Sequence, residues 1–240
     1  MKSADEVFTE LKTFGPYEVR VNATCKVPII IYAGPINLLS NIDIIISSEN
    51  IYFEMAKPYK PSTSGRLRNA AARKGPAGEI YDDIMFAELN EWMRINGRHG
   101  LAVPPATIAA TSSGELVKQD IRRIYHAAVV TPRIGTNEYD VEPQVLSLAV
   151  HNVFRQANRE RSELGFGFQS ICFPLLGAGR GGLEPLVSFV WMWKAISCEL
   201  LKDSSWKICF STWTRRETSD LISTLKEMAN AGQTETTSEA

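Results

Sequence analysis

The chain has 240 residues, of which 44% are hydrophobic, and its formal net charge is −1. This length and composition can bury a sizeable core and favour one large domain. The nearly balanced charge, without a clustered stripe of Lys and Arg, argues against nucleic acid as a partner.

Cysteine usage and hydropathy indicate the cellular compartment that the sequence favours. The four cysteines have no CxxC or similar metal spacing, and Cys172 and Cys209 lie inside apolar, strand-like runs. We therefore expect buried thiols in a reducing compartment, and no metal or resident cofactor. No apolar run reaches the length of a membrane span, and the first residues lack a signal-peptide core, which favours a cytoplasmic chain.

The predicted elements alternate between strands and helices in chain order. A half-buried strand (17–24) precedes a continuous apolar strand (27–33) and a short buried strand (43–46). The remaining predictions are helices at 66–74 and 79–96, strands at 107–110 and 121–130, a helix at 141–164, a strand ending at Pro174, a helix at 183–201, a strand at 207–212 and a helix at 217–229. This alternation predicts a layered α/β domain with helices on both faces of the sheet. We divide the chain into an N-terminal extension with an edge strand (1–26), the α/β domain (27–230) and a disordered polar tail (231–240).

A glycine-rich loop is the most informative segment. The predicted strand that ends at Pro174 is followed by Gly177, Gly179, Gly181 and Gly182, and an apolar helix pattern begins at Leu183. Strand, glycine loop and helix together direct backbone N–H groups and a helix N-terminus toward an anion, usually a phosphate. Glycines suit such a loop because they tolerate positive φ and let a ligand approach the backbone closely.

Two polar segments follow other predicted strands. Ser47 and Asn50 come directly after a buried strand, where hydroxyl and amide groups can hold a ribose, although the same residues can merely satisfy turn backbone. Residues 111–116 are typical of a turn that leads into a short helix, and we expect a structural role for them.

Five segments, in order and spacing, resemble the macro domain family, an ADP-ribose-binding α/β/α module. DIIISSEN (43–50) is similar to the family's strand that ends in an Asn-Ala-Ala-Asn loop, and GRLRNAAA (65–72) resembles the helix that follows it. ATIAATSSGEL (106–116) and IYHAA (124–128) resemble the two middle strands, and FPLLGAG (173–179) with Gly181-Gly182 resembles the phosphate loop. The resemblance spans about 27–228 and implies a three-layer α/β/α sandwich with a mixed, mostly parallel sheet.

The sequence also departs from the family pattern. Pro35 stands where the family has an aspartate that accepts the adenine amino group, so Asn37 or another residue takes this part, or the adenine is held differently. Ser47 replaces the first asparagine of the ribose loop, while Asn50 matches the last. The aspartate that helps activate water in de-ADP-ribosylating members aligns with Ser64, which has no neighbouring His or carboxylate in sequence and is a poor general base.

The resemblance therefore favours a nucleotide-binding sensor over an enzyme, with no catalytic residue assigned. The diphosphate is expected on the glycine loop at the helix N-terminus, with Arg180 closing over it and Trp213 beside the nucleotide. The distal ribose is expected to face Ser47 and Asn50. The complete expected binding set is Asn37, Ser47, Asn50, Ser62, Ser64, Gly65, Gly177, Ala178, Gly179, Arg180, Gly181, Gly182 and Trp213. His126 and His151 are expected to pack rather than catalyse.

The altered first loop also resembles the sensor portion of Thoeris-type bacterial anti-phage effectors, in which a TIR enzyme makes an ADP-ribose-derived signal. This narrower resemblance implies a small-molecule nucleotide ligand. It leaves open a homo-oligomer, or an effector segment outside this chain. Two other readings remain: an ADP-ribosyl hydrolase with atypical catalytic residues, and a protein-interaction module whose pocket has decayed.

Overall fold

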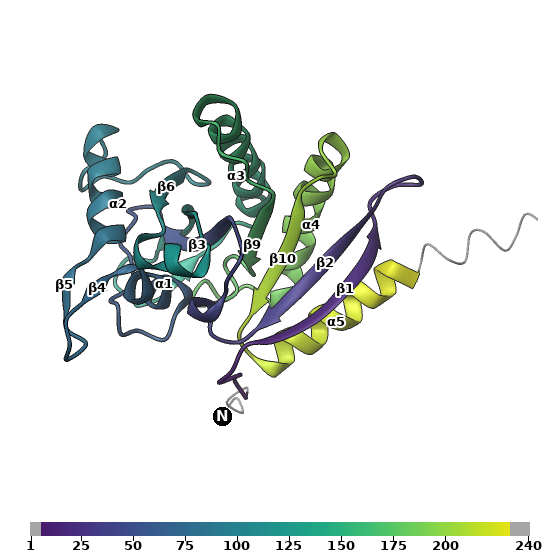
Figure 1. Cartoon of the computed structure of the whole chain (residues 1–240), viewed down its shortest axis with the longest axis horizontal. Helices are drawn as coiled ribbons and strands as arrows, with labels where there is room; N and C mark the ends of the chain where they lie inside the picture. The colour runs from purple at the N-terminus through teal and green to yellow at the C-terminus, as the bar shows by residue number, and fades with distance from the viewer. Residues whose placement is uncertain (1–5, 231–240) are drawn as a thin grey trace, which may run out of the picture.

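A computed structural model of the chain describes residues 6–230 and shows a mixed sheet between two layers of helices (Figure 1). The eight-stranded sheet has the order β1-β2-β10-β9-β3-β7-β6, with β8 paired to β7. The strands β2, β10, β9, β3 and β7 run parallel, whereas β1, β6 and β8 are antiparallel to their neighbours. This arrangement confirms the predicted fold class.

The strands are β1 (Lys12–Arg20), β2 (Lys26–Ala33), β3 (Ile44–Asn50), β6 (Ile108–Ser112), β7 (Arg123–Pro132), β8 (Tyr139–Asp140), β9 (Ser170–Pro174) and β10 (Lys207–Thr212), and β4 (Arg73–Lys74) and β5 (Ile80–Asp82) form a separate hairpin. The helices are α1 (Thr63–Ala71), α2 (Ile84–Ile95), α3 (Pro143–Leu164), α4 (Pro185–Lys202) and α5 (Arg215–Asn230), with short 3-10 helices at Ile36–Leu38 and Gly114–Gln119.

Alternation along the strands divides the core between the two faces of the sheet. On β3, Ile44 and Ile46 pack in the cluster that includes α3, α4 and α5, whereas Ile45 packs in the cluster formed with α1 and α2. Because successive strand residues point to opposite faces, this parity also determines where the polar residues at the end of β3 point.

The structure corrects several predicted boundaries. The strand expected at 43–46 continues to Asn50, since it pairs with β7 along its whole length. The helix expected at 66–74 begins at Thr63, where the Ser62 hydroxyl caps it by accepting a hydrogen bond from the Gly65 amide at 3.2 Å. The expected helix at 79–96 is shorter, because its first residues form β5. The tail expected to be disordered from residue 231 lies outside the described residues.

The prediction of buried thiols at Cys172 and Cys209 is confirmed, since both are free cysteines and buried. Burial, with the neighbouring Cys172, raises the pKa of the Cys209 thiol. In the described part of the chain, no helix combines the length and apolar character needed to cross a membrane. Nor do three His, Cys, Asp or Glu side chains within residues 6–230 gather into a candidate metal site.

Candidate functional site

Two cavities meet at the glycine loop, at the carboxyl ends of the central strands. We call them the Glu49 cavity, of about 140 Å³, and the Trp213 cavity, of about 360 Å³. Six residues line both: Ser62, Thr63, Pro174, Leu175, Gly179 and Arg180. Together the two volumes fall in the range of ~300–1,000 Å³ that is usual for small-molecule sites. The site is therefore one cleft with two arms and a shared middle.

The glycine loop has free backbone N–H groups where the two cavities meet. The loop closes on itself through hydrogen bonds from the Gly182 amide to the Gly179 carbonyl at 3.1 Å and from the Leu183 amide to the Gly177 carbonyl at 3.2 Å. Among residues 6–230, no group accepts a hydrogen bond from the N–H of Gly179, Arg180 or Gly181. Consecutive free amides in a glycine turn form a concave donor surface of the kind that binds anions.

Two loop glycines are required by the conformation. Gly177 has φ +74°, in the left-handed region, and a Cβ on Gly181 would lie 2.5 Å from the Gly177 carbonyl oxygen. A Cβ on Gly179 would meet nothing within 4 Å. The surface at Gly179 is therefore open to a ligand, while Gly181 holds the loop together.

The N-terminus of α4 is occupied by a side chain, which corrects the expectation that it receives the anion. The helix begins at Pro185, and the Glu184 carboxylate accepts hydrogen bonds from the amides of Leu186 at 2.9 Å and Val187 at 3.3 Å. This cap could be predicted from the sequence, because a proline at the first helical position after an oxygen-bearing side chain is typical of a capped helix start. The loop amides, in contrast, are open to an anion.

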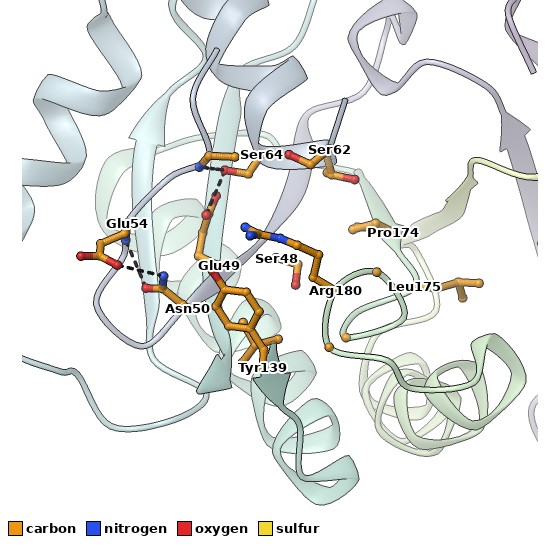
Figure 2. Close-up of a pocket in the computed structure, with 16 residues that line it drawn as sticks. Ser48, Glu49, Asn50, Glu54, Ser62, Ser64, Tyr139, Pro174, Leu175 and Arg180 are labelled. Atoms are coloured by element: carbon orange, nitrogen blue, oxygen red, sulfur yellow. Dashed lines mark hydrogen bonds between the residues drawn. The ribbon is translucent and has the colours of Figure 1, made fainter. Parts of the chain in front are cut away.

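A buried carboxylate lies at the far end of the Glu49 cavity. Glu49 is 3% exposed, and one of its oxygens accepts a hydrogen bond from the Ser47 hydroxyl at 2.6 Å. The other accepts a hydrogen bond from the Ser64 hydroxyl at 2.9 Å (Figure 2). His126 Nδ1 lies 3.4 Å from the same carboxylate. The α1 helix supplies Ser64 to this network, because Ser47 and Glu49 point to the face of the sheet that α1 covers.

This geometry corrects two expectations. Ser47 is fully buried and does not line either cavity. Because β3 continues past Ser47, its side chain points to the same face of the sheet as Glu49 and donates to it. Ser64 does have a carboxylate beside it, supplied by Glu49 fifteen positions earlier in the chain.

Asn50 closes the turn after β3 and also lines the Glu49 cavity. Its Oδ1 accepts hydrogen bonds from the amides of Tyr52 at 2.9 Å and Glu54 at 3.2 Å, which closes the turn after β3. Its Nδ2 lies 3.4 Å from the Glu54 carboxylate, and both side chains line the Glu49 cavity (Figure 2).

The Trp213 cavity is built around a stacked pair. The Arg66 guanidinium carbon lies 4.0 Å from the centre of the Trp213 ring. Arg66 Nε is buried without a hydrogen-bond partner, and burial lowers the pKa of this guanidinium. Glu217 accepts hydrogen bonds from the amides of Trp213 and Thr214 and so fixes the backbone that carries the ring.

No protein-family model and no curated protein matches the sequence. Solved structures do match. The Oceanobacillus iheyensis macrodomain with ADP superposes with a TM-score of 0.65 at 16% identity, over 93% of this chain and 100% of that chain. The Trypanosoma brucei macrodomain in complex with ADP-ribose superposes with a TM-score of 0.55 at 15% identity, over 84% of this chain and 72% of that chain. This chain has the macrodomain fold.

Within the macrodomain fold, most of the expected binding residues line the cleft. In the Glu49 cavity they are Asn50, Ser62, Ser64, Gly177, Gly179, Arg180 and Gly181. In the Trp213 cavity they are Ser62, Ala178, Gly179, Arg180 and Trp213. Arg180 spans the two, and its guanidinium carbon lies 4.7 Å from the centre of the Tyr139 ring (Figure 2).

Besides Ser47, three expected residues lie outside the two cavities. Asn37 lines a neighbouring hollow with Tyr59 and Lys60, which shares Pro61 and Arg66 with the Trp213 cavity. Gly65 is packed against the preceding loop, where a Cβ would lie 2.6 Å from the Lys60 carbonyl oxygen, and Gly182 lines neither cavity.

Sequence reasoning missed several residues that line the cleft, among them Glu49, Glu54, Tyr139 and Arg66. Glu49 was missed because pairing with β7 extends the strand through the polar segment. Tyr139 was missed because it comes from β8, a two-residue strand paired to the end of β7.

Proposed function

We propose that this chain binds ADP-ribose, or a nucleotide derived from it, as a sensor or regulatory domain. The observation that carries the proposal is the row of free amides at Gly179, Arg180 and Gly181, situated where the two cavities meet. ADP-ribose has the matching shape, with a diphosphate between two arms. Solved macrodomain structures of the same fold contain ADP or ADP-ribose, which supports this ligand class.

In this proposal the diphosphate lies on the loop amides, with the Arg180 guanidinium over it. Arg180 forms no ion pair within the described residues, so its charge is available to a ligand. Each hydrogen bond to a charged group contributes about 1.5–3 kcal/mol. The base lies in the Trp213 cavity, where aromatic stacking contributes about 1–3 kcal/mol, and the terminal ribose lies in the Glu49 cavity.

The finer part of the proposal is that the ligand is a signalling nucleotide, as in the anti-phage sensors that the altered first loop resembles. Binding would then change an association or conformational equilibrium of the protein. A ligand can do so only if its affinity differs between the two states.

Calorimetric titration with ADP and ADP-ribose tests the binding proposal. We expect saturable binding at micromolar or lower concentration, lost in Gly179→Val, because this side chain enters the open space where the diphosphate lies. Gly167→Val is the matched control, since its Cβ also meets nothing within 4 Å and it lies outside both cavities. Unchanged affinity in Gly179→Val would remove the diphosphate from the loop.

One observation favours hydrolysis as a second candidate. Glu49 lies 2.9 Å from Ser64, so a carboxylate is present beside the position where the family pattern has its water-activating aspartate. Incubation of the protein with an ADP-ribosylated peptide, followed by chromatography of the nucleotide products, separates the two functions. Release of ADP-ribose, absent in Glu49→Gln, would establish the hydrolase.

A further inference from the structure

Charge is distributed unevenly along the Glu49 cavity. The free amides lie on the glycine-loop side and two carboxylates, Glu49 and Glu54, line the opposite side, while the Arg180 side chain extends from the loop across the cavity (Figure 2). An anion is therefore favoured at one side of this cavity and disfavoured at the other.

The two carboxylates differ in their surroundings. Glu49 is 3% exposed and held by the Ser47 and Ser64 hydroxyls, so it cannot turn away from the cavity without breaking both hydrogen bonds. Glu54 is exposed, and its carboxylate has one long contact, 3.4 Å from Asn50 Nδ2. Solvent and salt screen a charge at Glu54, whereas a charge at the buried Glu49 acts through a lower effective dielectric.

The two hydroxyls that face Glu49 are already engaged. The Ser47 and Ser64 hydroxyls donate to Glu49 itself, and the Ala56 amide donates to the Ser64 oxygen at 3.1 Å. A negatively charged ligand group that took these donors from Glu49 would leave the carboxylate unpaired, which is costly in a buried site. A hydroxyl or amine on the ligand can instead donate to the carboxylate without breaking any of these bonds.

We propose that Glu49 is a selectivity residue: it makes the cleft accept nucleotide diphosphates whose terminal group presents hydroxyl or amine donors, and reject those that end in a phosphate or carboxylate. The inference rests on the proposed function and names the ligand class of the same site. It assigns Arg180 to the diphosphate, because this side chain starts from the glycine loop that supplies the free amides.

The test compares three ligands by calorimetry: ADP, ADP-ribose, and ADP-ribose phosphorylated at its terminal anomeric carbon. In the unaltered protein we expect ADP-ribose to bind at least about tenfold more tightly than its phosphorylated form, because exclusion of an unpaired charge is how sites reject close analogues. In Glu49→Gln, an isosteric change that keeps an acceptor for one hydroxyl, we expect this ratio to fall to about threefold or less.

Glu54→Gln is the matched control, since it removes the exposed carboxylate of the same cavity. It should leave the ratio within about twofold of the unaltered value, because screened surface charges contribute little. Equal affinity for the two ADP-ribose forms in the unaltered protein would overturn the inference alone. An absence of binding by all three ligands would overturn the proposed function and the inference with it.

A salt titration keeps the test decisive if Glu49→Gln fails to fold. Discrimination by the buried Glu49 should persist at about 0.5 M NaCl, where the screening length is a few ångströms and surface charges are largely neutralised. A ratio that falls to unity as salt is raised would assign the discrimination to exposed charge and contradict the role of Glu49.

Discussion

The two arms of the cleft are built in opposite ways. The Glu49 cavity is small, and its buried carboxylate is hydrogen-bonded to the Ser47 and Ser64 hydroxyls before any ligand arrives. The Trp213 cavity is more than twice as large, and its main side chains are an aromatic ring and a guanidinium with a buried, unbonded Nε.

Because of this difference, we expect the Trp213 cavity to contribute mainly affinity and the Glu49 cavity mainly selectivity. A roomy cavity with a stacked ring gains free energy from any flat group that enters, whichever base it is. A small cavity whose hydrogen bonds are already satisfied gains little from an average ligand, but loses much from one that disrupts the network. The glycine loop serves both arms, so damage to the loop should affect every ligand.

Gly181→Ala should have the largest effect, because it disrupts the glycine loop, which both arms of the cleft share. The new Cβ would lie 2.5 Å from the Gly177 carbonyl oxygen and 2.4 Å from Val141 Cγ2, so the loop must rearrange. We expect the free energy of unfolding to fall by about 1–3 kcal/mol in urea denaturation, and binding of ADP to be lost.

Gly182→Ala is the control for Gly181→Ala. Its Cβ meets nothing within 4 Å, although its φ of +70° adds backbone strain of about 1–2 kcal/mol. ADP binding should therefore survive in this variant. Survival of binding in Gly181→Ala instead would show that the loop geometry is not what the cleft depends on.

Trp213→Ala should have the next largest effect, confined to one arm. Loss of stacking should weaken ADP and ADP-ribose alike by about 10- to 100-fold, the equivalent of ~1–3 kcal/mol. Trp213→Phe retains a ring for Arg66 and should recover most of the affinity. A loss confined to ADP-ribose, with ADP unchanged, would place the base in the other arm.

The sequence predicts the parts of the fold and site that local patterns determine, but not those that depend on tertiary contacts. The strands at 27–33 and 207–212 and the glycine loop were recognisable, because apolar runs and clustered glycines are local patterns. The end of β3 was not, because pairing with β7, and not composition, carries the strand through Ser47 and Glu49 to Asn50.

The missed site residues are those that depend on tertiary contacts. Arg66 and Trp213 are far apart in sequence, and nothing in the residues around either one indicates that they stack. Ser64 looked isolated because its carboxylate partner comes from β3, across the first loop. Local patterns thus predict the loop that holds an anion, but not the side chains that select its substituents.

Ser64→Ala should have the smallest effect, confined to the Glu49 arm. It removes one donor to Glu49 and the acceptor of the Ala56 amide, so the free energy of unfolding should fall by about 1 kcal/mol in urea denaturation. ADP affinity should stay within about twofold, because the effect of a removed hydrogen bond is local. The affinity for ADP-ribose should change, since Glu49 loses part of its support.

Ser62→Ala is the matched control for Ser64→Ala, because it removes the helix cap at a similar cost of about 1 kcal/mol without touching Glu49. The ratio of ADP-ribose to ADP affinity should thus change in Ser64→Ala and stay constant in Ser62→Ala. If both variants shift this ratio equally, the start of α1 acts on the cleft through its backbone, and the hydrogen bond to Glu49 has no separate part in ligand choice.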